Sequence, residues 1–270
     1  MRFAFIAGLF ASVVFGIIGT YVVVKRIVFI SGGIAHASFG GVGLAVYLGL
    51  NPILGAAVFA LASALGIGLL SKMTLQREDT TIGILWAIGM ALGAFFIFIT
   101  PGYGVNPASF LFGNILMLNG LDLLLLAGLS ALTLVSTVLL YHRFQAISFD
   151  EEFTRVVGVS TLVLYLYLLA LVALTVVFLI KFVGIILVIA MLTIPSSIVS
   201  QFTHDLRRVM FFSMVLSAIL IFTGLWISYV FDFIPGATIV LLSGIVFIVA
   251  TALKRFADSG TKKAEDGSVA

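Results

Sequence analysis

The sequence predicts an all-α integral membrane protein, a polytopic bundle of about eight to nine transmembrane helices. Of its 270 residues, 62% are hydrophobic and 9% are charged, whereas about 25% of the residues in an average soluble domain are charged. The mean hydropathy is +1.31. Long stretches such as 27–71 and 80–121 contain no Lys, Arg, Asp or Glu. Since about 20 apolar residues cross a bilayer as a helix, these stretches predict membrane spans.

The composition excludes several other classes of protein. The polar side chains are too few to cover a soluble domain, and the hydrophobicity is too high for disorder. The absence of cysteine excludes disulfides and thiolate metal sites. The apolar runs lack the alternation of a membrane β-barrel. The net charge of +3 is explained by basic cytoplasmic loops. We therefore expect the chain to lie in a lipid bilayer and not to bind nucleic acid.

Charged residues and one turn signal divide the chain into candidate helices. Asn51–Pro52 suits a tight turn within the long uncharged interval. Lys181 separates two further spans. In the alternative, residues 156–204 form one broken or re-entrant unit, and the chain then has eight spans. The predicted spans are 3–24, 28–50, 52–71, 81–100, 121–141, 159–180, 182–200, 209–230 and 234–253.

The positive charges predict that the N-terminus lies outside and the C-terminus inside. Positive residues concentrate in cytoplasmic loops, and this orientation places 12 of the 14 Lys and Arg residues inside. Only Arg2 and Lys181 then lie outside. Residues 1–255 are expected to form the transmembrane domain, and residues 256–270 a disordered cytoplasmic tail. No G-x-x-x-x-G-K-[ST] phosphate loop occurs, so we expect the chain not to hydrolyse nucleotide by itself.

Ionisable residues within spans are the best pointers to function in a membrane protein. His36 is the only one well inside a predicted span. It is either a hydrogen-bonded core histidine or a pore-lining metal ligand or proton carrier. Gly40 and Gly43 lie on the same helix face as His36, so we expect that face to leave room for a small substrate. Gly89 and Gly93 form a G-x-x-x-G packing motif.

Two further segments carry candidate functional residues. Asp122, at the outer end of a span, is either a solvated helix-start carboxylate or a pore-mouth acid that attracts cations. The amphipathic inner loop 148–158 is either an interfacial helix or a short helix that docks into a groove on a cytoplasmic partner. Pro195 is expected to kink or break its helix, and broken helices line sites in many transporters. The candidate coupling residues of the loop are Phe149, Asp150, Glu151, Glu152, Phe153 and Arg155.

Four segments together resemble a known family. They are SGGIAHASFGGVGLAVYLG, FLFGNILMLNGLDL, SFDEEFTRVVGV with the stretch ending VIAMLTIPSSIVSQFTHDLRRVM, and GLWISYVFDFIPGATIVLLSGIVFI. The chain resembles, over about residues 3–255, the permease subunits of ATP-binding-cassette importers for zinc, manganese and iron(II).

The resemblance implies a function, partners and site residues. It implies a homodimer in the prokaryotic cell membrane, two copies of a separate ATPase inside and an extracytoplasmic metal-binding protein. A divalent metal ion is the cargo, ATP is bound by the partner, and no cofactor is bound permanently. The resemblance also implies that the inner loop is the coupling helix and that His36 and Asp122 line the metal path. Ser38 and Asn114 complete that candidate set.

One departure from the family pattern concerns the metal ligands. Family members typically carry G-D-x-x-S-H-A, but here Gly32 stands for the Asp and Ala35 for the Ser. Imidazole suits zinc, while carboxylate oxygens suit manganese. The ion therefore moves with water and backbone ligands or uses Asp122. The alternatives are an import permease for a metal chelate or a cobalamin-like substrate, and an ion-coupled secondary transporter, which usually carries more buried acids.

Overall fold

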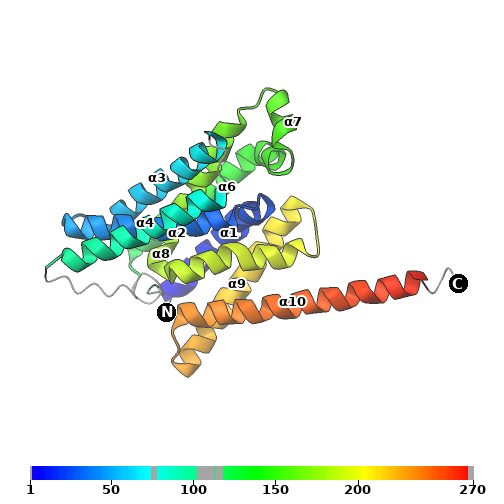
Figure 1. Cartoon of the computed structure of the whole chain (residues 1–270). Coiled ribbons are helices and arrows are strands. Elements are labelled where there is room, and N and C mark those ends of the chain that lie inside the picture. Colours follow the sequence, from blue (N-terminus) through cyan, green and yellow to red (C-terminus); the bar gives the residue numbers. More distant parts are fainter. Residues whose placement is uncertain (1, 74–77, 102–112, 114–117, 267–270) are drawn as a thin grey trace.

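The computed structural model describes residues 2–73, 78–101, 113 and 118–266, and every regular element in these ranges is a helix (Figure 1). Eight of the helices are long and apolar enough to cross a membrane. The short helix α7 is the exception. The helices are α1 (Arg2–Val24), α2 (Val28–Tyr47), α3 (Pro52–Met73), α4 (Glu78–Ile99), α6 (Gly120–Phe149), α7 (Glu151–Val156), α8 (Thr161–Ser200), α9 (Leu206–Phe231) and α10 (Pro235–Asp266).

Helix α8 contains both of the spans predicted at 159–180 and 182–200. Its 40 residues are interrupted at Gly184, where φ is +81° and ψ is 164°. Glycine adopts such a conformation without the steric cost that a Cβ brings. Two helices therefore meet here, as the division at Lys181 predicts, and their junction lies three residues further along, at Gly184. The break predicted at Pro195 is misplaced, because the chain stays helical there and Pro195 is buried.

Contacts along α8 show that its two halves run in opposite directions. Lys25, at the end of α1, lies over the ring of Tyr165 near the start of α8. Lys181, just before the break, pairs with Asp122 at the start of α6. After the break, the Ser196 hydroxyl lies 3.5 Å from that of Thr20, again near the end of α1. Helix α8 thus leaves one end of the bundle, reaches the other and returns (Figure 1).

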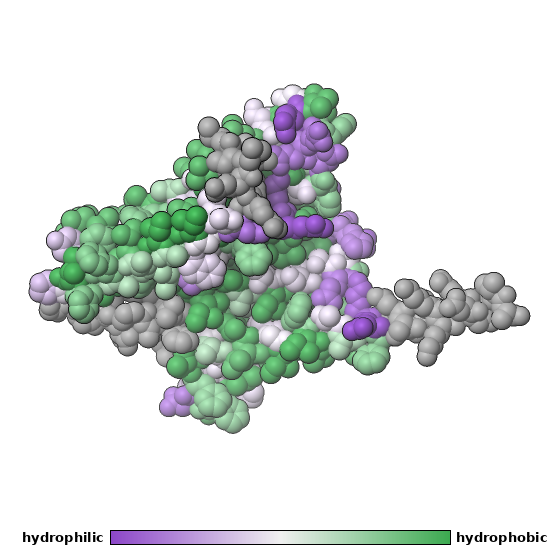
Figure 2. Space-filling view, in the orientation of Figure 1, coloured by the Kyte–Doolittle hydropathy of each residue, from purple (hydrophilic) through white to green (hydrophobic). Residues whose placement is uncertain are grey.

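The bundle therefore has two distinct ends, which we call the α7 end and the Asp122 end. At the α7 end, Arg207 lies over the ring of Tyr141, and Lys254 donates to the backbone carbonyl of Gln201. Hydrophilic side chains gather near α7 and beside the start of the grey tail, while apolar side chains cover the flanks of the helices (Figure 2). An apolar flank of this kind matches the hydrocarbon of a bilayer.

Helix α2 is held between α3 and α4 by glycines. A Cβ at Gly40 would lie 2.9 Å from the carbonyl oxygen of Gly89, and one at Gly43 would lie 2.5 Å from that of Gly93. Small residues allow helices in lipid to approach this closely. The packing role predicted for Gly89 and Gly93 is thus confirmed. The room expected beside Gly40 and Gly43 does not exist, because the α4 backbone fills it.

The last helix is longer than the sequence predicts. Helix α10 begins at Pro235, close to the predicted start at 234, and its backbone remains helical to Asp266. The predicted span ends at 253, and the segment from 256 onward was expected to be disordered. In the structure, the backbone of residues 256–266 continues the helix past the body of the bundle (Figure 1).

Candidate metal path and coupling surface

His36 lies on α2 and stacks on an aromatic ring of α4. The centroids of the imidazole and the Trp86 ring are 4.0 Å apart, and the two planes differ by 11°. The imidazole is partly buried. Its Nδ1 is buried and has no hydrogen-bond partner among the described residues. The structure thus does not bear out a hydrogen-bonded core histidine, and it leaves a nitrogen lone pair or N–H available for a ligand.

The other candidates on α2 differ from His36. The Ser38 hydroxyl is buried and donates to the carbonyl of Ala35 at 2.6 Å, within its own helix. Gly32 lies one turn before His36, and a Cβ there would meet only side chains, Trp86 at 3.8 Å and Ile189 at 4.0 Å. The backbone at Gly32 therefore leaves room for a side chain, and the absent family carboxylate is not explained by crowding.

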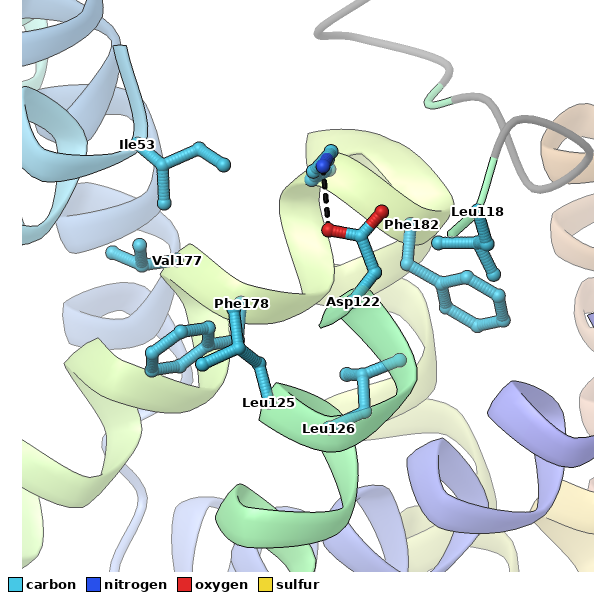
Figure 3. A pocket seen from close by; sticks show the side chains of 9 residues that line it. Ile53, Leu118, Asp122, Leu125, Leu126, Val177, Phe178 and Phe182 are labelled. Atoms are coloured by element: carbon cyan, nitrogen blue, oxygen red, sulfur yellow. Dashed lines mark hydrogen bonds and ion pairs between the residues drawn. The ribbon is translucent and has the colours of Figure 1, made fainter. Parts of the chain in front are cut away.

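Asp122 is buried and already paired with a cation. It caps the start of α6: its backbone N–H donates to the Asn119 side chain, and its Oδ2 accepts from the Asn119 backbone N–H. Its Oδ1 lies 2.5 Å from the Lys181 ammonium (Figure 3). Both carboxylate oxygens are thus engaged. The prediction of a solvated helix-start carboxylate is right about the position of Asp122 at the start of α6. It is wrong about solvation, because Asp122 is 6% exposed.

A small pocket beside this ion pair is otherwise apolar (Figure 3). It lies where α6 meets the first half of α8, close to the break at Gly184. Its other lining residues are Ile53, Leu118, Leu125, Leu126, Val177, Phe178 and Phe182. Among the described residues that line it, Asp122 and Lys181 alone carry charge, and the two charges have opposite signs.

The candidate path residues do not form one cluster. His36 contacts α4, whereas Asp122 contacts α8, and Asn114 lies outside the described residues. Within the described ranges, no three His, Cys, Asp or Glu residues lie together in a metal-binding arrangement. The described residues of one chain therefore do not form a tight chelating site. A transport path needs weak binding so that its ion can leave.

The inner loop forms the short helix α7, as its pattern predicts. Asp150 caps it by accepting the Phe153 backbone N–H at 2.8 Å, and Gly158 ends the turn with φ of +85°. Thr154 is buried and donates to the Asp150 carbonyl. The apolar side chains of the segment face outward and are 62–82% exposed: Phe149, Phe153, Val156 and Val157. Glu152 and Arg155 are exposed beside them.

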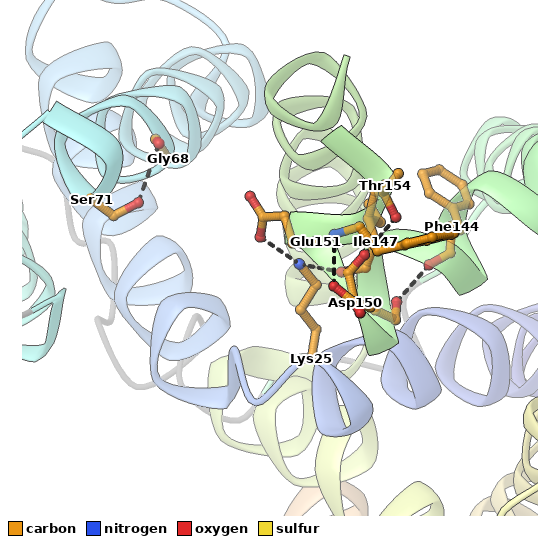
Figure 4. Close-up of polar contacts among 10 residues, drawn as sticks. Lys25, Gly68, Ser71, Phe144, Ile147, Asp150, Glu151 and Thr154 are labelled. Carbon is orange, nitrogen blue, oxygen red and sulfur yellow. Dashed lines mark hydrogen bonds and ion pairs between the residues drawn. The ribbon is translucent and has the colours of Figure 1, made fainter. Parts of the chain in front are cut away.

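One residue of the α1–α2 corner holds this segment in place. Lys25 donates from Nζ to the Ile147 carbonyl at 2.7 Å and to the Glu151 carboxylate at 3.2 Å (Figure 4). The sequence alone does not predict the contacts of Lys25, Lys181 and Trp86. The partners of these residues lie far away in the chain, so local pattern carries no signal for them.

Comparison with known proteins gives the family. The model of the ABC 3 transport family matches residues 1–254. The chain belongs to the ABC 3 transport family. The eight candidate spans found in the described part of the chain agree with a membrane protein of that family.

Similar sequences carry names of transport proteins. A probable metal transport system membrane protein of Chlamydia pneumoniae is 41% identical over 257 residues, which cover 93% of this chain and 88% of that protein. The manganese transport system membrane protein MntC of Listeria innocua is 30% identical over 247 residues, which cover 92% and 88% of the two chains.

Two solved structures share this fold. PsaBC from Streptococcus pneumoniae, in complex with Fab, matches with a TM-score of 0.82 and 28% identity, over 92% of this chain and 90% of that chain. An inward-facing putative metal-chelate type ABC transporter matches with a TM-score of 0.72 and 18% identity, over 93% and 85%. The second likeness concerns the fold alone. The predicted ABC importer permease fold is confirmed.

Proposed function

We propose that this chain is the permease subunit of an ABC importer that moves a divalent metal ion, zinc, manganese or iron(II), into the cell. The observation that carries the proposal is the capped helix α7, whose exposed apolar residues Phe153 and Val156 form a docking face. A separate ATPase that binds this face supplies the energy. The names of the MntC and Chlamydia relatives support a metal cargo.

The proposed orientation places the α7 end in the cytoplasm and the N-terminus outside. Basic side chains at this end, including Lys25, Arg207 and Lys254, support it by the positive-inside rule. The Asp122 end then faces an extracytoplasmic metal-binding protein. Two copies of the chain form the transport unit, as the family resemblance implies.

His36 is the proposed metal-path residue on α2. Its Nδ1 is buried without a hydrogen-bond partner among the described residues, and Trp86 holds the ring plane. Asp122 takes part in the path only when it separates from Lys181. Ser38 has a lesser role, because its hydroxyl is held by its own helix. Asn114 remains part of the proposed set.

The cargo is tested in a deletion strain grown in metal-poor medium. Cellular zinc, manganese and iron are measured after complementation with the wild type or with His36→Ala. We expect one metal to fall on deletion and only the wild type to restore it. If no metal changes, while a chelate or cobalamin is lost from the cell, the metal-ion proposal fails and the organic-substrate alternative replaces it.

Docking at α7 is tested with the complete transporter in vesicles. Phe153→Ala combined with Glu151→Ala removes one side chain of the apolar face and one acidic group of the helix. We expect uptake to fall well below the wild-type value while ATP hydrolysis continues. The matched control is Phe211→Ala, which truncates a similarly exposed Phe on α9. Unchanged uptake in the α7 variant contradicts the coupling role.

A further inference from the structure

The corner between α1 and α2 is short and well defined. Helix α1 ends at Val24, and α2 begins at Val28. The backbone N–H of Lys25 donates to Tyr21, and that of Ile27 donates to Val22. Arg26 between them has φ of +59°. A displacement of this corner therefore moves the start of α2 directly, and α2 carries His36 two turns further on.

Lys25 joins this corner to three other elements. Its ammonium donates to the Ile147 carbonyl in the last turn of α6, where helical carbonyls lack N–H donors of their own. It pairs with Glu151, the first residue of α7, at 3.2 Å. It also lies 5.2 Å from the ring centroid of Tyr165 in the first turns of α8. Figure 4 shows Lys25 reaching from the corner toward the start of α7.

The Lys25 side chain is 11% exposed, and that of Glu151 is 25% exposed. Water therefore screens the pair less than it screens a surface ion pair. Helix α7 itself packs against α6 and α8. Lys25 is thus a direct polar connection between the proposed docking helix and the corner that begins α2.

We propose that Lys25 is a positioning residue that transmits the movement of α7 to α2. This inference rests on the proposed function. When the ATPase moves α7, the charge-assisted hydrogen bonds of Lys25 carry the α1–α2 corner with it. The movement reaches the His36 segment through α2, whose glycines pack directly on the α4 backbone. Lys25 touches neither cargo nor nucleotide, so its effect is on the number of ions moved per ATP.

The test compares two charge-removing variants of the same corner in the complete transporter. Lys25→Met keeps the apolar stem and removes the ammonium. Arg26→Met removes a neighbouring charge whose side chain is exposed. Lys25→Arg keeps the charge and serves as the conservative variant. Metal uptake and ATP hydrolysis are measured in the same vesicles, at equal amounts of assembled complex.

We expect Lys25→Met to lower the ratio of metal uptake to ATP hydrolysis by about tenfold, the equilibrium factor that corresponds to one charge-assisted hydrogen bond. Arg26→Met and Lys25→Arg should keep the ratio within about twofold of the wild type, because exposed charges contribute little. An unchanged ratio in Lys25→Met overturns the proposal, whether both rates are normal or both fall together.

A second variant keeps the proposal testable if Lys25→Met does not assemble. Glu151→Gln removes one partner and leaves the bond to Ile147 intact. It should lower the ratio by a smaller factor, and an unchanged ratio again overturns the proposal. Failure of the proposed function gives a different result, because the wild-type vesicles then take up no metal ion with ATP.

Discussion

The Lys181 ammonium lies 2.5 Å from Oδ1 of Asp122 and joins the start of α6 to the last residues of α8 before its break. Gly184, three positions along, adjoins Gly113, so the break is packed from a second direction. The two partners are not equally exposed. The Lys181 side chain is 44% exposed, whereas that of Asp122 is 6% exposed. Water can therefore solvate an unpaired Lys181 but not an unpaired Asp122.

This asymmetry predicts unequal effects on stability. Lys181→Met leaves a buried carboxylate without its cation and should lower the free energy of unfolding by about 1–3 kcal/mol. Asp122→Asn leaves a lysine that water can reach and should cost less. Thermal unfolding of the purified protein in detergent measures both. Lys181→Arg is the matched control, since it keeps the charge, and equal losses in the two variants contradict the argument.

The glycine contacts of α2 predict a second stability effect. Gly43→Ala places a methyl group 2.5 Å from the Gly93 carbonyl oxygen, and neither helix backbone can move away cheaply. We expect a loss of about 1–3 kcal/mol from overpacking. Gly83→Ala is the control, because nothing lies within 4 Å of its Cβ position. In a helix interior, alanine there should be neutral or stabilising by up to about 1 kcal/mol. Similar unfolding temperatures for the two variants would falsify the packing account.

The helices themselves could be predicted because their signals are local. Uncharged runs must be buried in lipid or protein, and Asn51–Pro52 marks a turn by its own chemistry. The amphipathic pattern of 148–158 likewise predicted a short helix, which the structure shows as α7. These features depend on residues that are close together in the sequence, so they can be predicted from the sequence alone.

The break in α8 and the contacts of the site depend on distant residues. Pro195 is a general helix breaker, but the helix continues through it, and Gly184 takes the left-handed conformation instead. Asp122 and Lys181 are 59 residues apart, and Lys25 and Glu151 are 126 apart. The chain has 14 basic and 11 acidic residues, so charge alone does not select these pairs. Packing decides them, as it decides the stacking of Trp86 on His36.

The stacking of Trp86 on His36 predicts an effect on uptake. Trp86 is 37% exposed, so its replacement leaves the core of the bundle largely intact. Trp86→Ala removes the surface that fixes the imidazole plane and should lower metal uptake about two- to tenfold, since aromatic pairs contribute about 0.5–1.5 kcal/mol. Trp86→Phe keeps a ring and should stay near the wild type. Uptake per assembled complex in vesicles is the measurement, and equal uptake in both variants contradicts this role.

The open position at Gly32 predicts a change in metal preference. A Cβ there would meet only Trp86 and Ile189 side chains at 3.8 and 4.0 Å, so Gly32→Asp fits beside the backbone. Its carboxylate would lie one helical turn before His36, on the same face. Because oxygen ligands suit manganese better than an imidazole alone does, we expect uptake to shift toward manganese over zinc.

The control for this change is Gly32→Asn, which has the same shape without the charge. Competition between zinc and manganese for uptake in vesicles gives the preference of each variant. A carboxylate within a span carries a desolvation cost of about 3 kcal/mol unless a partner or water meets it, so the amount of assembled Gly32→Asp protein should fall. A shift in Gly32→Asp that is absent from Gly32→Asn places position 32 beside the moving ion. The same preference in both variants places the ion elsewhere, and His36 then acts without a ligand at position 32.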